Sequence, residues 1–253
     1  MFKASALSIC CALLAATAAA QTYTYEFDPV SAAGVKGAIK VQYASPESSK
    51  ATIAADLDFS GVDFAALQKA DGNCTSPVTE YKWHIHVKWS SSKTSESFAQ
   101  CSLAATGNHY DPLRACGPNS EYSQTPECVA KIPKYACNPA NYSADPLVCE
   151  KGDLSGKFGG FKLDASKKAS GKWVDEHYPL VKENTPQWNM ILHAVCGKAT
   201  PRVACALAKE SGKPSPSPNA TTPAPTTGSP TTKPVIVYPT TAPATTKSQC
   251  YTA

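Results

Sequence analysis

Two histidines with one residue between them are the first sign of chemistry in this sequence. His84 and His86 lie in the segment Tyr81–Trp89, in which apolar and polar residues alternate. Successive side chains of a β-strand point to opposite faces, so both imidazoles project from the polar face of such a strand. Side chains two residues apart on one face can converge on a single ion, and imidazole is a common ligand of transition metals. The pair indicates a metal site without defining it.

A second segment repeats this arrangement. In Gln187–Val195 the residues Trp188, Met190 and Leu192 share one face, and His193 projects from the other. A buried core histidine is the usual interpretation of a single histidine on a strand. It fits poorly here, because three of the five histidines lie on polar faces.

Four short motifs, taken in order, resemble the copper/zinc superoxide dismutase superfamily. They are Trp83-His84-Ile85-His86-Val87, Gly107-Asn108-His109-Tyr110-Asp111-Pro112, Gly152-Asp153-Leu154-Ser155-Gly156 and Pro201-Arg202-Val203-Ala204-Cys205. The match covers roughly residues 22–208, and His193 lies between the last two motifs, where the family keeps a further copper ligand.

The resemblance implies roles for individual residues. One copper ion per chain would be bound by four histidines, His84, His86, His109 and His193. Arg202 would stand beside the metal, where its guanidinium attracts and orients an anion. Cys101 and Cys205 would form the disulfide that holds the ligand loop to the barrel.

Two departures from the family point to a subgroup. The family's zinc site needs further histidines between His109 and Asp153, and the sequence has none there; Glu150 stands where the last one would be. The stretch from His193 to Arg202 is also too short for the family's long charged loop. Both losses resemble the copper-only superoxide dismutases, secreted proteins of fungi and oomycetes, so zinc is not expected.

In that subgroup the glutamate at the position of Glu150 contacts the histidine at the position of His109. Such a carboxylate sets the tautomer and orientation of the ring and can return a proton to it, a catalytic role. Asp153 would then be structural, bonding backbone or groups around the ligands. His177 has no counterpart in the family and is interpreted as a solvated loop histidine.

Alternation with a period of two dominates the rest of the body, and helical stripes are scarce. Ile39, Val41 and Tyr43 share one face, and Ile53 and Leu57 repeat the pattern. The sequence therefore predicts an all-β fold, a Greek-key β-sandwich or barrel of immunoglobulin-like architecture, over residues 21–210.

The two ends of the chain predict export. Residues 1–20 combine Lys3, an apolar run and small residues before Gln21, which is typical of a signal peptide. Residues 211–253 are rich in Pro, Thr and Ser and predict a disordered, O-glycosylated stalk without the apolar tail of a GPI anchor. The expected location is extracellular, with the tail free or attached to a cell wall, and no transmembrane segment is expected.

Cysteine usage agrees with an exported protein. The body contains eight cysteines and no Cys-x-x-Cys pair, so disulfides are expected. Apart from Cys101 and Cys205, six body cysteines allow fifteen pairings. Cys250 permits either a disulfide to another chain or a bridge to the body. Sequons at Asn73, Asn141 and Asn219 suit a glycoprotein.

The net charge of +4 does not belong to the body. Lys3 lies in the leader and three lysines lie beyond Glu210, which leaves 20 basic and 20 acidic residues between them. A neutral body without a Lys/Arg run argues against nucleic acid as a partner. It also excludes steering by net charge, so anion attraction would depend chiefly on Arg202.

The activity implied by the resemblance is dismutation of superoxide to oxygen and hydrogen peroxide. A non-catalytic extracellular copper-binding module and a structural wall protein are the alternatives from other classes. A copper polysaccharide monooxygenase would need a histidine at the mature N-terminus, where Gln21 stands. The segment 111–148 carries no motif and is interpreted as a disulfide-pinned loop; oligomeric state is left open.

Overall fold

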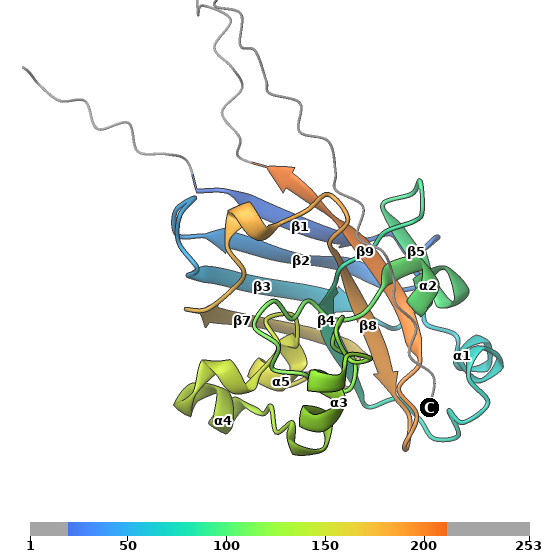
Figure 1. Ribbon diagram of the computed structural model, residues 1–253. Helices are drawn as coiled ribbons and strands as arrows, with labels where there is room; N and C mark the ends of the chain where they lie inside the picture. The colour runs from blue at the N-terminus through green and yellow to red at the C-terminus, as the bar shows by residue number, and fades with distance from the viewer. Residues whose placement is uncertain (1–19, 212–253) are drawn as a thin grey trace, which may run out of the picture. The chain divides into compact units, whose positions relative to one another are not determined.

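The computed structural model describes residues 20–211 (Figure 1). The predicted leader ends at Ala20 and the predicted stalk begins at Ser211, so both segments lie outside the described residues apart from these two boundary positions. Cys250 and the sequon at Asn219 also lie outside them.

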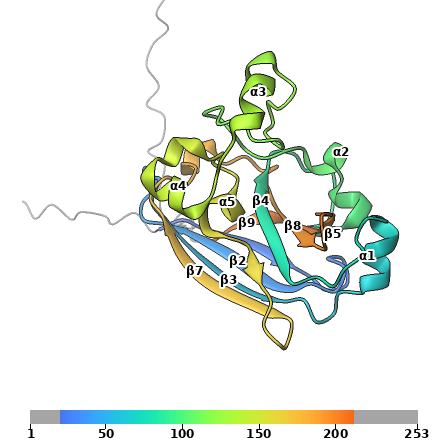
Figure 2. The same ribbon diagram turned by 90° about the horizontal axis from the view of Figure 1, so that it is seen from below.

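Nine antiparallel strands form the framework of the described chain. Their bounds are β1 Thr22–Phe27, β2 Lys36–Tyr43, β3 Ala51–Asp58, β4 Glu80–His86, β5 Ser95–Ser97, β6 Phe161–Lys162, β7 Lys168–Asp175, β8 Asn189–Val195 and β9 Arg202–Ser211. The hydrogen-bonded order is β6-β4-β8-β9-β1-β2-β3-β7, with β5 added on β9. The two strands at the ends of this order, β6 and β7, follow each other in the chain, so the sheet folds round into a nearly closed barrel (Figure 2). The all-β prediction is confirmed.

The alternation read from the sequence decides which face of each strand enters the core. In β2, Ile39, Val41 and Tyr43 are buried while Lys40 and Gln42 are exposed. The same alternation in the neighbouring strands brings large side chains together inside the barrel, among them Trp83 and Tyr25. Burial of these apolar faces is the main stabilising contribution to the barrel.

Short helices lie outside the barrel. The α-helices are α1 Phe64–Ala70, α2 Leu103–Thr106, α3 Pro126–Lys131, α4 Pro139–Ala144 and α5 Leu154–Phe158, and 3₁₀ turns occupy Phe98–Cys101, Ile132–Lys134, Pro146–Val148 and Val181–Glu183. In both views α4 and α5 lie on one side of the barrel and α1 and α2 on the other (Figures 1 and 2). Within residues 20–211, none of the helices has the length and hydrophobicity needed to cross a bilayer.

Four disulfides join all eight body cysteines to one another. The pairs are Cys74–Cys196, Cys101–Cys205, Cys116–Cys128 and Cys137–Cys149. The second pair is the one that the resemblance implies, and the other three were beyond sequence reasoning. Two of the bridges lie within the segment that follows His109, where they close loops of 12 residues each. None of the eight body cysteines is left over for Cys250.

Candidate metal centre

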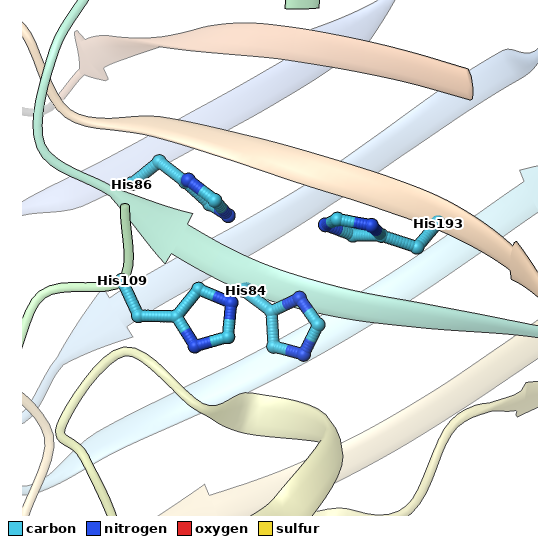
Figure 3. A group of neighbouring side chains, drawn as sticks. All are labelled: His84, His86, His109 and His193. Atoms are coloured by element: carbon cyan, nitrogen blue, oxygen red, sulfur yellow. The ribbon is translucent and has the colours of Figure 1, made fainter. Parts of the chain in front are cut away.

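Four buried histidines meet at one point on the outside of the barrel. His84 and His86 come from β4, His193 comes from β8, and His109 comes from the loop after α2 (Figure 3). One ring nitrogen of each lies within 4.8 Å of those of the others. The structure thus brings together all four histidines that the sequence analysis singled out.

Backbone pairing explains how His109 reaches the histidines of β4. The sequence pattern predicts that this strand continues to Trp89, but β4 ends at His86. From there the chain pairs with the loop instead: Val87 N–H donates to Asn108 O at 3.2 Å, and His86 forms an isolated β-bridge with His109. The early end of the strand is therefore what places the third imidazole beside the first two.

A bulge positions the next residue of the site. Across β8 and β9, Leu192 pairs with Ala204 but His193 pairs with Arg202, so Val203 is an extra residue in β9. Bulges of this kind redirect a side chain at a site. Here the bulge sets Arg202 directly opposite His193.

The hydrogen bonds of the histidines leave one nitrogen of each ring without a partner. His86 Nδ1 donates to Gly107 O at 2.9 Å, and His193 Nδ1 donates to Thr200 O at 3.1 Å. A carbonyl oxygen can only accept, so the proton is on Nδ1 and the lone pair is on Nε2 in both rings. These two Nε2 atoms are buried without a hydrogen-bond partner among the described residues.

In the other two rings, one nitrogen is bonded to a carboxylate instead of a carbonyl. His109 Nδ1 lies 2.6 Å from Glu150 Oε2, and His84 Nε2 lies 3.4 Å from Asp153 Oδ1. Again the remaining nitrogens, His109 Nε2 and His84 Nδ1, are buried and unpartnered within residues 20–211. Leaving a buried polar atom unpaired is costly, and four such atoms at one point fit a metal ion held by four imidazoles.

The protonation of the cluster agrees with this role. Burial, together with a smaller contribution from the nearby His109, lowers the pKa of His84 to about 4. Burial also holds the pKa values of His86 and His193 well below the ordinary value, with His109 adding to the shift of His86 and His84 to that of His193. These rings are neutral at physiological pH, which is the form that binds a metal.

Glu150 and Asp153 are buried beside the cluster, not on the surface. Glu150 is 1% exposed, and burial raises its pKa although the hydrogen bond with His109 opposes the shift. Asp153 caps α5, accepting from Gly156 N–H at 2.8 Å, and also accepts from the Tyr135 hydroxyl. Each carboxylate thereby orients one ring of the cluster.

The hydrogen bond with Glu150 engages His109 Nδ1, so this ring offers only Nε2 to a metal. His177, the fifth histidine, is exposed and belongs to a different surface, near Tyr142. The other group of potential ligands among the described residues is Asp111, Cys116 and Cys128, and its two cysteines are joined in a disulfide.

Arg202 is held by acceptors around the cluster. Its Nη1 donates to Cys101 O, Thr106 Oγ1 and Gly107 O at 3.0, 2.7 and 3.2 Å. Burial lowers the pKa of Arg202 to about 10, so it stays charged at neutral pH. The Cys101–Cys205 disulfide ties the segment that carries these three acceptors to β9.

A cavity of about 520 Å³ opens over the cluster. Its walls include His84, His109, His193 and Arg202, together with Lys82, Tyr135 and Glu150. A small anion that enters this cavity comes close to both the guanidinium of Arg202 and the imidazoles.

Three residues of the site were missed by sequence reasoning. Gly107 supplies the carbonyl shared by His86 and Arg202, Thr106 accepts from Arg202, and Tyr135 bonds Glu150 and Asp153. Gly107 stands in a motif that the sequence analysis quoted, so it carried a signal. Tyr135 lies in the segment without a motif, and its position follows only from the folding of that segment.

No protein-family model and no curated protein sequence matches this chain. Solved structures of superoxide dismutase 5 from Candida albicans do match. For its copper(II) form the TM-score is 0.46 with 20% identity, over 80% of this chain and 99% of that one. For a substituted form the TM-score is 0.45 with 19% identity, over 81% and 99%. At these identities and TM-scores the likeness decides nothing about the metal, substrate or activity of this chain.

Proposed function

We propose that this chain is a secreted, copper-dependent superoxide dismutase that works without zinc. One observation carries the proposal: four buried imidazole nitrogens without partners among the described residues converge beneath a cavity that also holds a fixed guanidinium. The cluster fits copper, because four nitrogen ligands suit both of its oxidation states. Copper bound there supplies one-electron exchange, so that two superoxide ions and two protons give one O₂ and one hydrogen peroxide.

The residues of the chain would divide the remaining work. Arg202 attracts superoxide electrostatically and orients it with the donors that its backbone partners leave free. Glu150 holds the Nδ1 proton of His109 and thereby directs Nε2 at the cluster. Glu150 Oε1 has no partner within residues 20–211, and the residue lines the cavity, so Glu150 is placed to relay the protons that peroxide requires.

The domain and its location are part of the proposal. Residues 21–210 would form the catalytic domain after removal of a leader, with the Pro/Thr/Ser-rich segment as a stalk. Four disulfides in one domain are typical of oxidising compartments, which supports an extracellular location.

Metal analysis combined with turnover tests the proposal. Purified protein reconstituted with copper should bind one copper and no zinc per chain and consume superoxide rapidly in a stopped-flow assay. His86→Ala should lose copper, whereas His177→Gln, which alters the exposed histidine, should keep both copper and turnover. Zinc at parity with copper would contradict the proposal.

Glu150 is tested in the same assay. Glu150→Gln keeps the shape of the side chain and an acceptor for His109 but cannot carry a proton. Turnover should therefore fall while the copper content stays at one per chain. Copper binding without turnover in the unsubstituted protein would favour a non-catalytic copper-binding module instead.

A further inference from the structure

The segment between His109 and Glu150 places Tyr135 beside the metal centre. Tyr135 lies between the two 12-residue disulfide loops, after Cys128 of the first and before Cys137 of the second. Its ring lines the cavity over the histidine cluster together with Glu150 and Asp153. The segment that had no motif in the sequence is therefore part of the wall of the site.

The hydroxyl of Tyr135 bonds to both residues that flank the cluster. It donates to Asp153 Oδ2 at 2.8 Å and accepts from the backbone N–H of Glu150 at 3.2 Å. Burial raises the pKa of Tyr135 above its ordinary value, so the hydroxyl keeps its proton and remains a donor. One oxygen atom thus sets the position of both acidic residues.

Each of those acidic residues orients a different ring. Glu150 Oε2 lies 2.6 Å from His109 Nδ1, and Asp153 Oδ1 lies 3.4 Å from His84 Nε2. The two rings are themselves stacked, with centroids 4.1 Å apart and planes inclined by 21°. A shift of the Tyr135 hydroxyl would therefore move two of the four rings by separate routes, His109 through Glu150 and His84 through Asp153.

Packing leaves Tyr135 and Glu150 little freedom. A Cβ atom at Gly117 would overlap Glu150 Oε1 and lie 2.9 Å from the Cε1 and Cζ atoms of the Tyr135 ring. Both side chains therefore pack directly against the backbone of Gly117, where a larger residue would displace them. Gly117 is held in turn by its neighbour Cys116, which is bonded to Cys128.

We propose that Tyr135 is a positioning residue of the metal centre, which sets the orientation of His84 and His109 toward the ion through Asp153 and Glu150. The inference rests on the proposed function only in taking copper as the ion. This role also explains the disulfide-bonded segment, because its two bridges flank Tyr135 and hold it against the carboxylates. In this role Tyr135 acts through the two carboxylates and supplies no ligand to the ion.

The chain offers a matched control in Tyr142. It belongs to the same segment, on α4, and its hydroxyl also donates to a buried aspartate, Asp175 on β7. Tyr142→Phe removes a hydroxyl and a buried hydrogen bond, as Tyr135→Phe does, but reaches neither Glu150 nor Asp153 directly. An effect seen in Tyr135→Phe but not in Tyr142→Phe therefore comes from the position of Tyr135 beside Glu150 and Asp153, and not from a general loss of stability.

Copper(II) alone is the first probe. In Tyr135→Phe the electron paramagnetic resonance spectrum of bound copper(II) should change, and copper affinity in a chelator competition should fall roughly ten-fold, the low end of the loss seen when groups that orient metal ligands are removed. In Tyr142→Phe both should match the unsubstituted protein. An unchanged spectrum and affinity in Tyr135→Phe, or equal changes in both variants, would overturn the inference.

Nuclear magnetic resonance of the metal-free protein is the second probe and does not depend on copper. Long-range ¹H–¹⁵N correlation of the imidazoles should show shifts at His84 and His109 in Tyr135→Phe, with His177 unmoved. If that variant does not fold, Gly117→Ala keeps the hydroxyl and displaces the ring and carboxylate, and the same two histidines should shift. Unmoved His84 and His109 in the folded variant would overturn the inference.

The two proposals can fail separately. A protein that binds copper but does not consume superoxide contradicts the proposed function, while the spectra still decide the role of Tyr135. A protein with normal turnover and no response to Tyr135→Phe contradicts the inference alone.

Discussion

Each ring of the histidine cluster has its free nitrogen chosen by the partner of the other nitrogen. His86 and His193 use backbone carbonyls, and His84 and His109 use carboxylates. The result is mixed: His84 offers Nδ1 and the others offer Nε2. Because these hydrogen-bond partners fix the tautomer of each ring before a metal binds, no ring has to change tautomer on binding. Fixed tautomers favour rapid and specific binding.

Burial of these neutral rings makes the stability of the metal-free protein depend on pH. A histidine whose pKa is lower in the folded protein than in the unfolded chain takes up a proton on unfolding. Its stabilising contribution is complete above the unfolded value of 6.5 and is lost as the pH falls toward the folded value, about 4 for His84.

We therefore expect the free energy of unfolding of the copper-free protein to fall as the pH drops from 6.5 to 5, by roughly 1 kcal/mol per pH unit for each such histidine. The raised pKa of Glu150 works in the opposite direction and reduces the slope. Urea denaturation across this range measures the effect, with His177→Gln as the control that should leave it unchanged. A flat profile would contradict the burial of neutral histidines.

The loop from α2 to His109 depends on one glycine. Gly107 has φ near +72°, a region that favours glycine, and its carbonyl accepts from both His86 Nδ1 and the guanidinium of Arg202. A Cβ atom there would lie 3.1 Å from Val87 Cγ2 and 3.2 Å from Lys88 Cβ. The glycine thus sets one ring of the histidine cluster and the guanidinium of Arg202 in register.

Gly107→Ala should destabilise the protein by about 1–2 kcal/mol from backbone strain and also weaken copper binding, because the shared carbonyl must turn away. Gly159→Ala is the matched control: φ is +84° there, but nothing lies within 4 Å of the added Cβ. Thermal unfolding should shift in both variants, and copper affinity only in the first. Equal copper affinity in the two variants would contradict the role of the Gly107 carbonyl.

The strands were predictable from the sequence, and the loops between them were not. Alternation is a local property with a period of two, so the inward side of β2 and the common face of His84 and His86 could be read directly. The burial of these histidines could not, because the covering segments come from distant parts of the chain. The disulfide pairing and the position of Tyr135 depend on the same non-local packing, which strand periodicity cannot predict.

The bulge in β9 shows the same limit within a regular element. Simple alternation places His193 on the face of its strand that points away from the core, and in the structure His193 lies outside the core cluster that contains Leu192 and Ala194. The extra residue at Val203, which brings Arg202 opposite His193, leaves no mark in the sequence pattern. Arg202 could be assigned only through its motif and the family that the motif resembles.

Charge over the whole described barrel is balanced, so under the proposed function any attraction of superoxide must be local. The segment between the ends carries 20 acidic and 20 basic residues. The structure adds a second cation to the Arg202 that the sequence predicts: Lys82, opposite His193 in the β4–β8 register, also lines the cavity. Two cations lining one cavity can attract an anion within a Debye length, about 8–10 Å, even when the net charge is zero.

Two lysine substitutions separate local charge from net charge. Lys82→Gln and Lys172→Gln remove the same unit charge, but Lys172 is exposed on β7 and does not line the cavity. At low ionic strength, Lys82→Gln should lower kcat/KM about twofold, the effect of one charge roughly 10 Å from the anion in water, and Lys172→Gln should not. The difference should vanish in high salt. Equal losses in both variants would show that net charge guides the substrate, and a steep salt dependence in both would reveal a charged surface outside the cavity.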